Sequence, residues 1–262
     1  MTASDSVLLH TDPHGVATLT INRAEKHNAF DDAIIAELTA KLKKLDADES
    51  VRVVVLTGAG KTFSAGGDLN WMRSMAAFSE KENIEDALKL ADLMEILDGL
   101  SKPTLAKVNG PAYGGGVGLV ACCDIAICTE SAKFALTEVR LGLIPAVISP
   151  YVIAAIGEHQ ARRYFLTAEP IEAQTAYHIG LVHEVVTPDI LDETVSMLAA
   201  SLLKGGPEAL RVAKRFIAEQ SAVDRKALKK KTAQLIAELR TSREGQEGLT
   251  AFLEKRSPDW IK

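Results

Sequence analysis

The sequence predicts an α/β protein with a helical C-terminal region, and two observations lead to this fold class. Apolar and β-branched runs alternate with segments of helical periodicity as far as Pro188, which is the pattern of β-α-β units. Beyond that residue, strand-like runs disappear and helical periodicity continues through Leu253. We therefore expect an α/β core at residues 1–187 and a helical C-terminal subdomain at residues 188–262.

The first β-α-β unit can be followed along the chain. The residues of Val16–Ile21 are largely β-branched and alternate, as in a half-buried strand. Asp31 or Asp32 is expected to cap a helix whose apolar residues recur at helical spacing from Ile34 to Leu45. A strand is expected at Val51–Thr57, and its apolar run Val53–Leu56 does not alternate, which predicts a strand that is covered on both faces.

A crossover arrangement continues through the middle of the chain. A long helix is expected from about Asn83 to Leu100, and a strand follows at Thr104–Val108. The triplet Gly114-Gly115-Gly116 then opens a helix of small residues that runs through Cys122. A further apolar strand covers Ile125–Cys128.

Composition narrows the classes of function. The 262 residues are 47% hydrophobic and 25% charged, which is ordinary for a globular protein. With 30 Lys and Arg against 35 Asp and Glu, the net charge is −5, so no nucleic-acid partner is expected. No apolar stretch reaches the roughly 18 residues of a membrane span, and no signal-like segment is present, so no membrane association is expected either.

Cysteine and histidine usage adds two expectations. Cys122, Cys123 and Cys128 lie within seven residues, which suits a reducing compartment better than a disulfide framework. The sequence therefore predicts a cytoplasmic protein. The six histidines lack the spacing of a metal site, so no metal is expected.

Two turns of small residues are candidate binding elements. Phe63–Asp68 and Asn109–Gly118 each join a predicted strand to a helix. Backbone N–H groups are unpaired at a helix N-terminus and the helix dipole favours negative charge there, so the two turns together could form an oxyanion hole. Ala65, Gly114 and Gly115 are small enough for a carbonyl to approach the main chain closely. Tight packing alone is the other interpretation of such turns, and the sequence leaves it open.

Glu138 is the candidate acid–base group. It lies beside Leu136 and Val139, and an apolar setting would raise the pKa of its carboxyl and suit it to proton transfer near neutral pH. A salt bridge from Glu138 to Arg140 or Lys133 is the structural alternative. The signatures of phosphate-binding loops and of the nucleophile elbow of serine hydrolases are missing.

Five segments in order resemble the crotonase, or enoyl-CoA hydratase/isomerase, superfamily. They are Ile21–Ala29, with Ala24 where proline is usual, Phe63–Asp68, Asn109–Gly118, Phe134–Gly142 and Phe252–Trp260. The resemblance implies a crotonase-like spiral of β-β-α units with a helical C-terminal region that mediates trimerisation. It also implies a homotrimer or a dimer of trimers, and an acyl-CoA substrate whose CoA is part of the substrate, with no separate cofactor.

The same resemblance implies roles for individual residues. The backbone N–H groups of Ala65 and Gly115 would hold the thioester oxygen and stabilise an enolate, with Glu138 as the acid–base group. Other residues would contact the substrate from the two turns, from the segment after Glu138 and, for the CoA moiety, from the last helix. These are Gly66, Asp68, Gly114, Gly118, Arg140, Ala146, Phe252 and Lys255.

Hydration and isomerisation compete as predicted reactions. Hydratases of the family use a second glutamate at the position of Gly118, whereas isomerases move a double bond with one acid at the position of Glu138. Ala146 matches the position whose backbone N–H helps to hold water in hydratases, which favours hydration.

A longer stretch indicates a substrate. Ala135–Tyr151 and Gly118–Asp124 resemble a bacterial subgroup assigned to 3-methylglutaconyl-CoA and carboxygeranoyl-CoA hydration. Such substrates carry a distal carboxylate that Arg140 could pair, although a structural pairing of Arg140 with a nearby acid is the favoured interpretation. The sequence thus predicts an enoyl-CoA hydratase for a branched substrate, with an enoyl-CoA isomerase as the alternative. A catalytically silent acyl-CoA or RNA binding protein is the alternative from another class, and the lysines at 226 and 229–231 are its only support.

Overall fold

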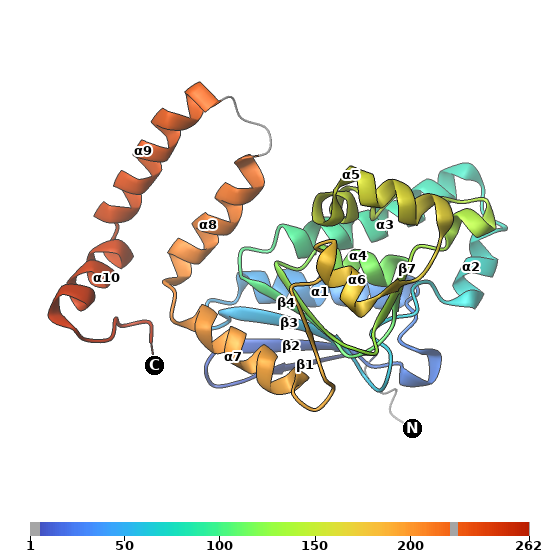
Figure 1. Cartoon of the computed structure of the whole chain (residues 1–262), viewed down its shortest axis with the longest axis horizontal. Coiled ribbons are helices and arrows are strands. Elements are labelled where there is room, and N and C mark those ends of the chain that lie inside the picture. The colour runs from blue at the N-terminus through green and yellow to red at the C-terminus, as the bar shows by residue number, and fades with distance from the viewer. Residues whose placement is uncertain (1–5, 221–224, 262) are drawn as a thin grey trace.

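The structure is a computed structural model and describes residues 6–220 and 225–261. Its centre is a mixed sheet in the order β1-β2-β3-β4-β6-β9. The six strands are β1 Val7–Thr11, β2 Val16–Ile21, β3 Val53–Gly58, β4 Thr104–Val108, β6 Ile125–Thr129 and β9 Glu184–Val186. β1 is antiparallel to β2, and every other pair in this sheet is parallel. The α/β fold expected from the sequence is confirmed (Figure 1).

A second, three-stranded sheet supports the region of the two glycine-rich turns. Its strands are β5 Ala112–Tyr113, β7 Lys133–Ala135 and β8 Ile171–Glu172. β5 pairs parallel to β7, and β7 pairs antiparallel to β8. A single bridge between Ser64 and Ala112 links the first turn to β5. This small sheet therefore holds the second turn and the segment before Glu138, and the bridge at Ser64 ties the first turn to it.

Ten α-helices lie within the described residues, together with two short 3-10 helices, Ala24–Lys26 and Glu138–Leu141. The α-helices are α1 Asp32–Ala47, α2 Leu69–Met75, α3 Glu80–Asp98, α4 Gly115–Ala121, α5 Ser149–Thr167, α6 Ala173–His178, α7 Leu191–Leu203, α8 Pro207–Gln220, α9 Arg225–Thr241 and α10 Arg243–Glu254. Asp31 is the cap of α1, since its side chain accepts a hydrogen bond from the N–H of Ile34 (3.1 Å). The apolar stripe predicted for this helix is buried from Ile34 to Leu45.

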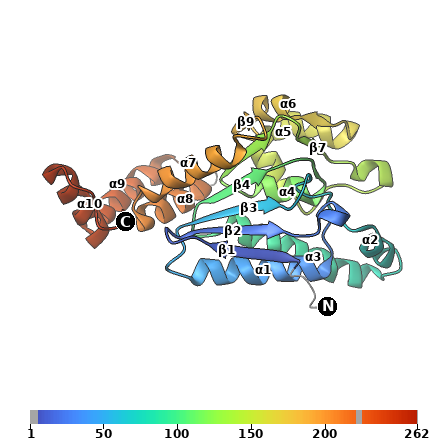
Figure 2. The same ribbon diagram turned by 90° about the horizontal axis from the view of Figure 1, so that it is seen from below.

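Helices cover both faces of the large sheet. Figure 2 shows α1 and α3 along one side of the strands and α7 on the other. α7 closes a second apolar cluster, in which Val195 and Ala199 pack with Val53 and Val55 of β3. All six residues of β3 are consequently buried, as the non-alternating run predicts.

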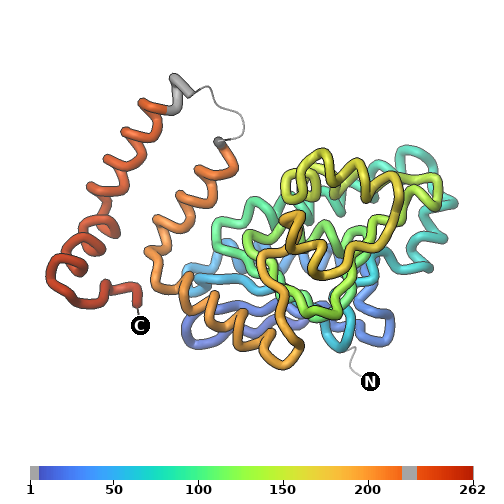
Figure 3. Tube along the Cα trace, in the orientation of Figure 1, coloured from blue at the N-terminus to red at the C-terminus, as the bar shows by residue number. Residues whose placement is uncertain are grey.

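The last three helices extend away from this core (Figures 1 and 3). Lys214 of α8 is tied to the core by an ion pair with Asp124 (Nζ to Oδ2, 2.8 Å) and a hydrogen bond to the carbonyl of Lys102 (3.3 Å). The domain boundary expected after residue 187 stays a prediction. The packing adds that α7 lies on the sheet, so the helices that project from the core begin with α8.

Three features bear on the expectations from composition. Cys122, Cys123 and Cys128 are buried free thiols, and burial raises the pKa of Cys123 and Cys128 to about 12. In the part of the chain that the structure describes, no His, Cys, Asp and Glu side chains gather as metal ligands would. None of the helices described is both long and apolar enough to cross a bilayer.

Candidate active site

The turn after β3 is held in place by Asn28, which lies between β2 and α1. The Asn28 side chain is fully buried, and its Nδ2 donates to the carbonyls of Ala59 (2.8 Å) and Thr62 (2.6 Å). The carbonyl of Asn28 accepts a hydrogen bond from Ser64 Oγ (2.9 Å). A segment far away in sequence therefore fixes the backbone of Phe63–Asp68 before any ligand binds.

Hydrogen bonding within this turn identifies its free donor. Five of its six backbone N–H groups are bonded inside the protein: Phe63 and Ser64 to Pro111 O (3.0 and 3.2 Å), Ala65 to His27 O (2.9 Å), Gly66 to Ser64 Oγ (3.2 Å) and Asp68 to Phe30 O (2.9 Å). The N–H of Gly67 has no acceptor among the described residues. The sequence-based assignment of Ala65 as an oxyanion donor is therefore corrected, because its N–H is already used, and the unpaired donor of the turn is Gly67.

Gly66 brings the first turn against the second. Its φ of +82° lies in the left-handed region, and a Cβ at this position would be 2.8 Å from the carbonyl oxygen of Tyr113. The N–H of Tyr113 donates to the carbonyl of Ser64 (2.9 Å). The two turns thus lie side by side, and only glycine permits this close approach.

Asp68, predicted to contact the substrate, is engaged within the protein. Oδ1 accepts from the N–H of Asn70 (2.8 Å) at the start of α2, and this bond contributes most to lowering the carboxyl pKa. Oδ2 faces Arg23 Nη2 (3.4 Å) and Lys26 Nζ (3.2 Å). We interpret Asp68 as a helix cap that holds the turn rather than as a ligand for the substrate.

The second turn presents a helix N-terminus. Gly115 is the first residue of α4, so its N–H has no acceptor within the helix, and Gly114 before it offers no side chain as a cap. The N–H of Gly114 itself donates to the carbonyl of Ala135 (2.9 Å). A Cβ on Gly115 would lie 2.4 Å from Cζ of the buried Phe30. Gly115 therefore fits the predicted role of an unpaired donor in a tightly packed setting.

The carboxyl of Glu138 lies over this helix start. A Cβ on Gly114 would be 3.1 Å from Glu138 Oε1. Oε2 is buried and has no hydrogen-bond partner among the described residues. Burial raises the pKa of Glu138, and a hydrogen bond from its own backbone offsets only part of that effect. An acid with a raised pKa next to unpaired N–H groups is suited to proton transfer.

The cations near Glu138 in sequence are occupied elsewhere. Lys133 pairs with Glu172 (Nζ to Oε1, 3.0 Å), and Arg140 Nη2 donates to the carbonyl of Ala168 (2.9 Å) at the end of α5. The salt-bridge interpretation of Glu138 is therefore wrong in this structure. The pairing of Arg140 with a substrate carboxylate stays a prediction.

Two other predicted residues have internal roles that the sequence did not reveal. The N–H of Ala146 donates to the carbonyl of Ile144 (2.8 Å), so the expectation that it holds water is contradicted by this bond. Gly118 is buried, and a Cβ there would lie 2.3 Å from Cγ2 of Ile148. The position of the family's second glutamate is thus blocked by Ile148.

The CoA-binding pair expected from the last helix is remote from Glu138 in the same chain. Figures 1 and 2 place α10 at the opposite end of the molecule from α2, which directly follows the first turn. Phe252 of α10 is 80% exposed, and Lys255 follows as the left-handed C-cap. One chain therefore does not bring Phe252 and Lys255 to the two turns.

Trp71, which follows Asp68 on α2, lies beside the first turn. Its ring packs beside Gly67, since a Cβ there would be 3.6 Å from Trp71 Cε3. Trp71 Nε1, like Glu138 Oε2, is a buried side-chain atom without a partner among the described residues. Both unpaired atoms thus belong to side chains that adjoin the two glycine turns.

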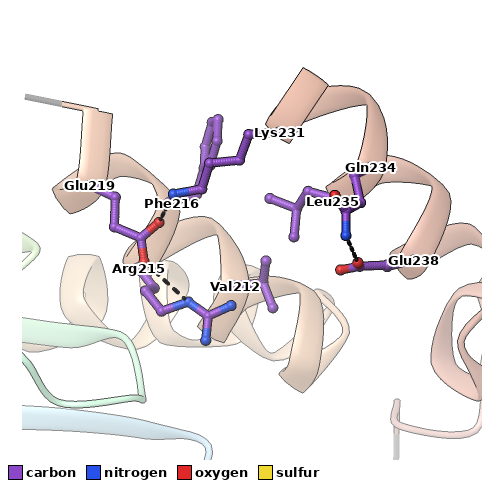
Figure 4. A pocket seen from close by; sticks show the side chains of 8 residues that line it. All are labelled: Val212, Arg215, Phe216, Glu219, Lys231, Gln234, Leu235 and Glu238. Atoms are coloured by element: carbon purple, nitrogen blue, oxygen red, sulfur yellow. Dashed lines mark hydrogen bonds and ion pairs between the residues drawn. The ribbon is translucent and has the colours of Figure 1, made fainter. Parts of the chain in front are cut away.

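A separate cavity of about 270 Å³ lies between α8 and α9 (Figure 4). It is lined by Val212, Arg215, Phe216, Glu219, Lys231, Gln234, Leu235 and Glu238. Lys231 closes one side through its ion pair with Glu219 (2.6 Å). The described acidic groups here are paired or exposed, so we place the reaction at Glu138 and not in this cavity.

Comparison with known proteins identifies the family. The family model described as enoyl-CoA hydratase/isomerase matches residues 11–262. The 2,3-dehydroadipyl-CoA hydratase of Escherichia coli is 34% identical over 256 residues, which cover 97% of this chain and 98% of that protein. An enoyl-CoA hydratase from Shewanella pealeana has a crystal structure that is similar with a TM-score of 0.93 and 44% identity, over 97% of this chain and 96% of that one. Pseudomonas aeruginosa AtuE gives a TM-score of 0.94 and 34% identity, over 98% of this chain and 100% of that one. This chain therefore belongs to the enoyl-CoA hydratase/isomerase family.

Proposed function

We propose that this protein is an enoyl-CoA hydratase that adds water to its substrate with Glu138 as the single acid–base group. The observation that carries this proposal is the buried, unpartnered Oε2 of Glu138 beside the unpaired start of α4. An unpaired buried polar group lowers stability by about 1 to 3 kcal/mol. Native proteins keep few such groups, and a catalytic role is one reason to keep one. Relatives named as hydratases, over nearly the whole chain, support the choice of reaction.

The two glycine turns would hold the thioester oxygen. The N–H of Gly67 and the N–H of Gly115 are the unpaired donors of adjacent turns. During water addition, negative charge develops on this oxygen, and a fixed donor in a dry site contributes about 3 to 4 kcal/mol to the transition state. We therefore assign Gly67 and Gly115, rather than Ala65 and Gly115, to this role.

Glu138 would carry the proton. As a carboxylate it takes a proton from water while the water oxygen bonds to the β-carbon and the double-bond electrons move toward the thioester oxygen. The protonated Glu138 then returns that proton to the α-carbon, the enolate collapses, and the carboxylate is restored. One water is consumed and no other reactant is needed, so a single acid is sufficient.

The pH dependence follows from the burial of Glu138. Because burial raises the pKa of this carboxyl, the carboxylate form needed to accept a proton appears at higher pH than for an exposed glutamate. Activity is therefore expected to rise with pH through this raised pKa. Replacing nearby apolar groups with polar ones should shift the rise to lower pH.

A branched enoyl-CoA with a distal carboxylate, such as 3-methylglutaconyl-CoA, is the proposed substrate. The stretch Ala135–Tyr151 supports it through its resemblance to that subgroup. The E. coli relative is named for 2,3-dehydroadipyl-CoA, whose acyl chain also ends in a carboxylate. Arg140 would have to leave the carbonyl of Ala168 to pair with such a group.

The CoA moiety is proposed to bind between subunits of a cytoplasmic homotrimer or dimer of trimers. Phe252 and Lys255 lie on a helix that projects from the core, with Phe252 and Leu253 largely exposed. A neighbouring subunit could bring this pair to the two glycine turns. The site would then be complete only in the assembly.

Isomerisation is the second candidate, and two contacts favour it. Ile148 fills the space that a glutamate at position 118 would need, and the N–H of Ala146 is bonded to the carbonyl of Ile144. Neither of the two groups that hold water in hydratases of the family is therefore provided here. Moving a double bond requires only that Glu138 remove a proton and return it at another carbon.

The test follows the enoyl-thioester absorbance after mixing protein with 3-methylglutaconyl-CoA, crotonyl-CoA or a 3-enoyl-CoA. Hydration predicts loss of absorbance with the first substrate, whereas a gain of absorbance with the 3-enoyl-CoA alone would assign the protein as an isomerase. Binding of acyl-CoA without turnover by any substrate would support the catalytically silent alternative. Binding of RNA by this protein would support the other silent alternative, although Lys231, one of its four lysines, is paired with Glu219 and the side chain of Lys226 lies outside the described residues.

A further inference from the structure

Two glycines at the start of α4 meet different partners. Gly114 is the N-cap residue, with a non-helical φ of +50° and ψ of −120°, and Gly118 lies one turn into the helix, where its N–H donates to the carbonyl of Gly114 (3.3 Å). A Cβ on Gly114 would meet Oε1 of Glu138 at 3.1 Å. A Cβ on Gly118 would meet Ile148 Cγ2 at 2.3 Å and Ile148 Cβ at 2.8 Å. Glu138 therefore lies beside the N-cap of α4, and Ile148 packs against the helix one turn further on.

Ile148 cannot easily move out of this position. It is only 2% exposed and belongs to the main apolar cluster. It is also the N-cap residue of α5, its carbonyl accepts from the N–H of Val152 (3.1 Å), and Pro150 restrains the first turn of that helix. The end of Met94, whose Cε would be 3.2 Å from a Cβ on Gly118, closes a further side.

We propose that Gly118 and Ile148 form a steric interlock, in which Ile148 is the residue that keeps this active site to one acid. The side chain of Ile148 occupies the volume into which a carboxyl on residue 118 would have to extend. Proton transfer beside the start of α4 is then left to Glu138. The chemical part of this inference rests on the proposed function, whereas the steric part does not.

The interlock also predicts which residue at position 148 would allow a side chain at position 118. A side chain at Gly118 requires loss of the whole Ile148 side chain, since even its Cβ would be 2.8 Å from the added Cβ. Glycine is the suitable replacement at 148, because glycine is well accepted at an N-cap. A glutamate at 118 is thus expected to fit only together with Ile148→Gly.

The steric part is tested by a double-mutant cycle of thermal or urea unfolding. The proteins are wild type, Gly118→Ala, Ile148→Gly and the double variant. We expect G118A to lower the unfolding midpoint in the wild-type background and to leave it unchanged or raise it in the I148G background. Equal effects of G118A in both backgrounds would overturn the interlock.

The chemical part is tested by the pH dependence of kcat/KM. We expect a single ionisation for the wild type and for I148G, and a second ionisation in G118E/I148G, where a new carboxyl is added one turn along α4 from the N-cap Gly114 that Glu138 adjoins. G118Q/I148G is the matched control, because its amide has the same shape but does not titrate, and it should keep the single ionisation.

The pH profile and the unfolding measurements test the chemical and the steric part of the proposal separately. A wild-type profile with two ionisations, or a G118E single variant that is as stable as wild type, would overturn the proposal. If the wild type turns over no enoyl-CoA, the proposed function fails, but the unfolding cycle still tests the interlock. A non-additive cycle would then stand as support for it independently of activity.

Discussion

Replacing Glu138 with glutamine separates catalysis from stability at one position. Glutamine keeps the shape of the side chain but cannot exchange a proton as a carboxyl does. General acid–base catalysis contributes about 10²- to 10⁴-fold, so kcat of Glu138→Gln should fall by at least about 100-fold, or about 2.7 kcal/mol in the barrier. Binding of the substrate should change little, because the thioester oxygen is assigned to backbone N–H groups that remain.

The same change should stabilise the folded protein at neutral pH. Glu138 Oε2 is buried and unpartnered, so the carboxylate places an uncompensated charge there, whereas the glutamine amide is neutral. Because the folded-state pKa is raised, the folded state holds the Glu138 proton to higher pH than the unfolded state does. This contribution to stability is complete below the unfolded-state pKa and is lost as pH rises through the folded-state pKa. The stability gain of E138Q should therefore be small in acid and grow toward neutral pH.

Urea unfolding at several pH values, together with initial rates, checks both statements. Glu172→Gln is the control, since Glu172 is an exposed carboxyl of the neighbouring strand β8 that pairs with Lys133. It should leave kcat unchanged and alter stability only slightly. Turnover by E138Q at the wild-type rate, or an E138Q protein less stable than wild type at neutral pH, would refute this account of Glu138.

Three further predictions concern the turn, the projecting helices and the shared site. Gly66→Ala should lower the free energy of unfolding by about 1 to 3 kcal/mol because of its φ of +82° and its approach to Tyr113, and an unchanged urea midpoint would contradict this. Lys214→Met should loosen α8 from the core, so limited proteolysis of the C-terminal helices should become faster than in wild type. Phe252→Ala should raise KM. If subunits share the site, oligomers reassembled from a mixture of F252A and E138Q subunits should regain activity, whereas activity no higher than the sum of the two separate variants would argue against sharing.

The sequence was sufficient for those elements whose patterns are local. Asp31 caps α1 and the stripe from Ile34 to Leu45 is buried, since both depend on neighbours within a few residues. Glu138 likewise could be proposed from its apolar surroundings. β5, β7, β8 and β9 were not predicted, because strands of two or three residues carry little periodicity of their own. β1 was not predicted either.

The parts that sequence reasoning missed depend on distant partners. Ala65 and Gly67 are both small residues of one turn, and only the carbonyl of His27, 65 − 27 = 38 residues earlier, shows which N–H is already used. Ile148 lies 148 − 118 = 30 residues beyond Gly118, and nothing in the residues around the glycine indicates what fills the missing volume. A large apolar residue in the segment predicted to face a helical glycine is the signal that could have indicated Ile148.

Incubation with 3-methylglutaconyl-CoA in heavy-oxygen water, followed by mass spectrometry, tests the central claim most directly. The account predicts that the wild type incorporates one heavy oxygen into the acyl chain and that Glu138→Gln does so at least about 100-fold more slowly. Wild-type protein that leaves the acyl chain unlabelled, or an E138Q protein that labels it at the wild-type rate, would contradict the claim of hydration through Glu138.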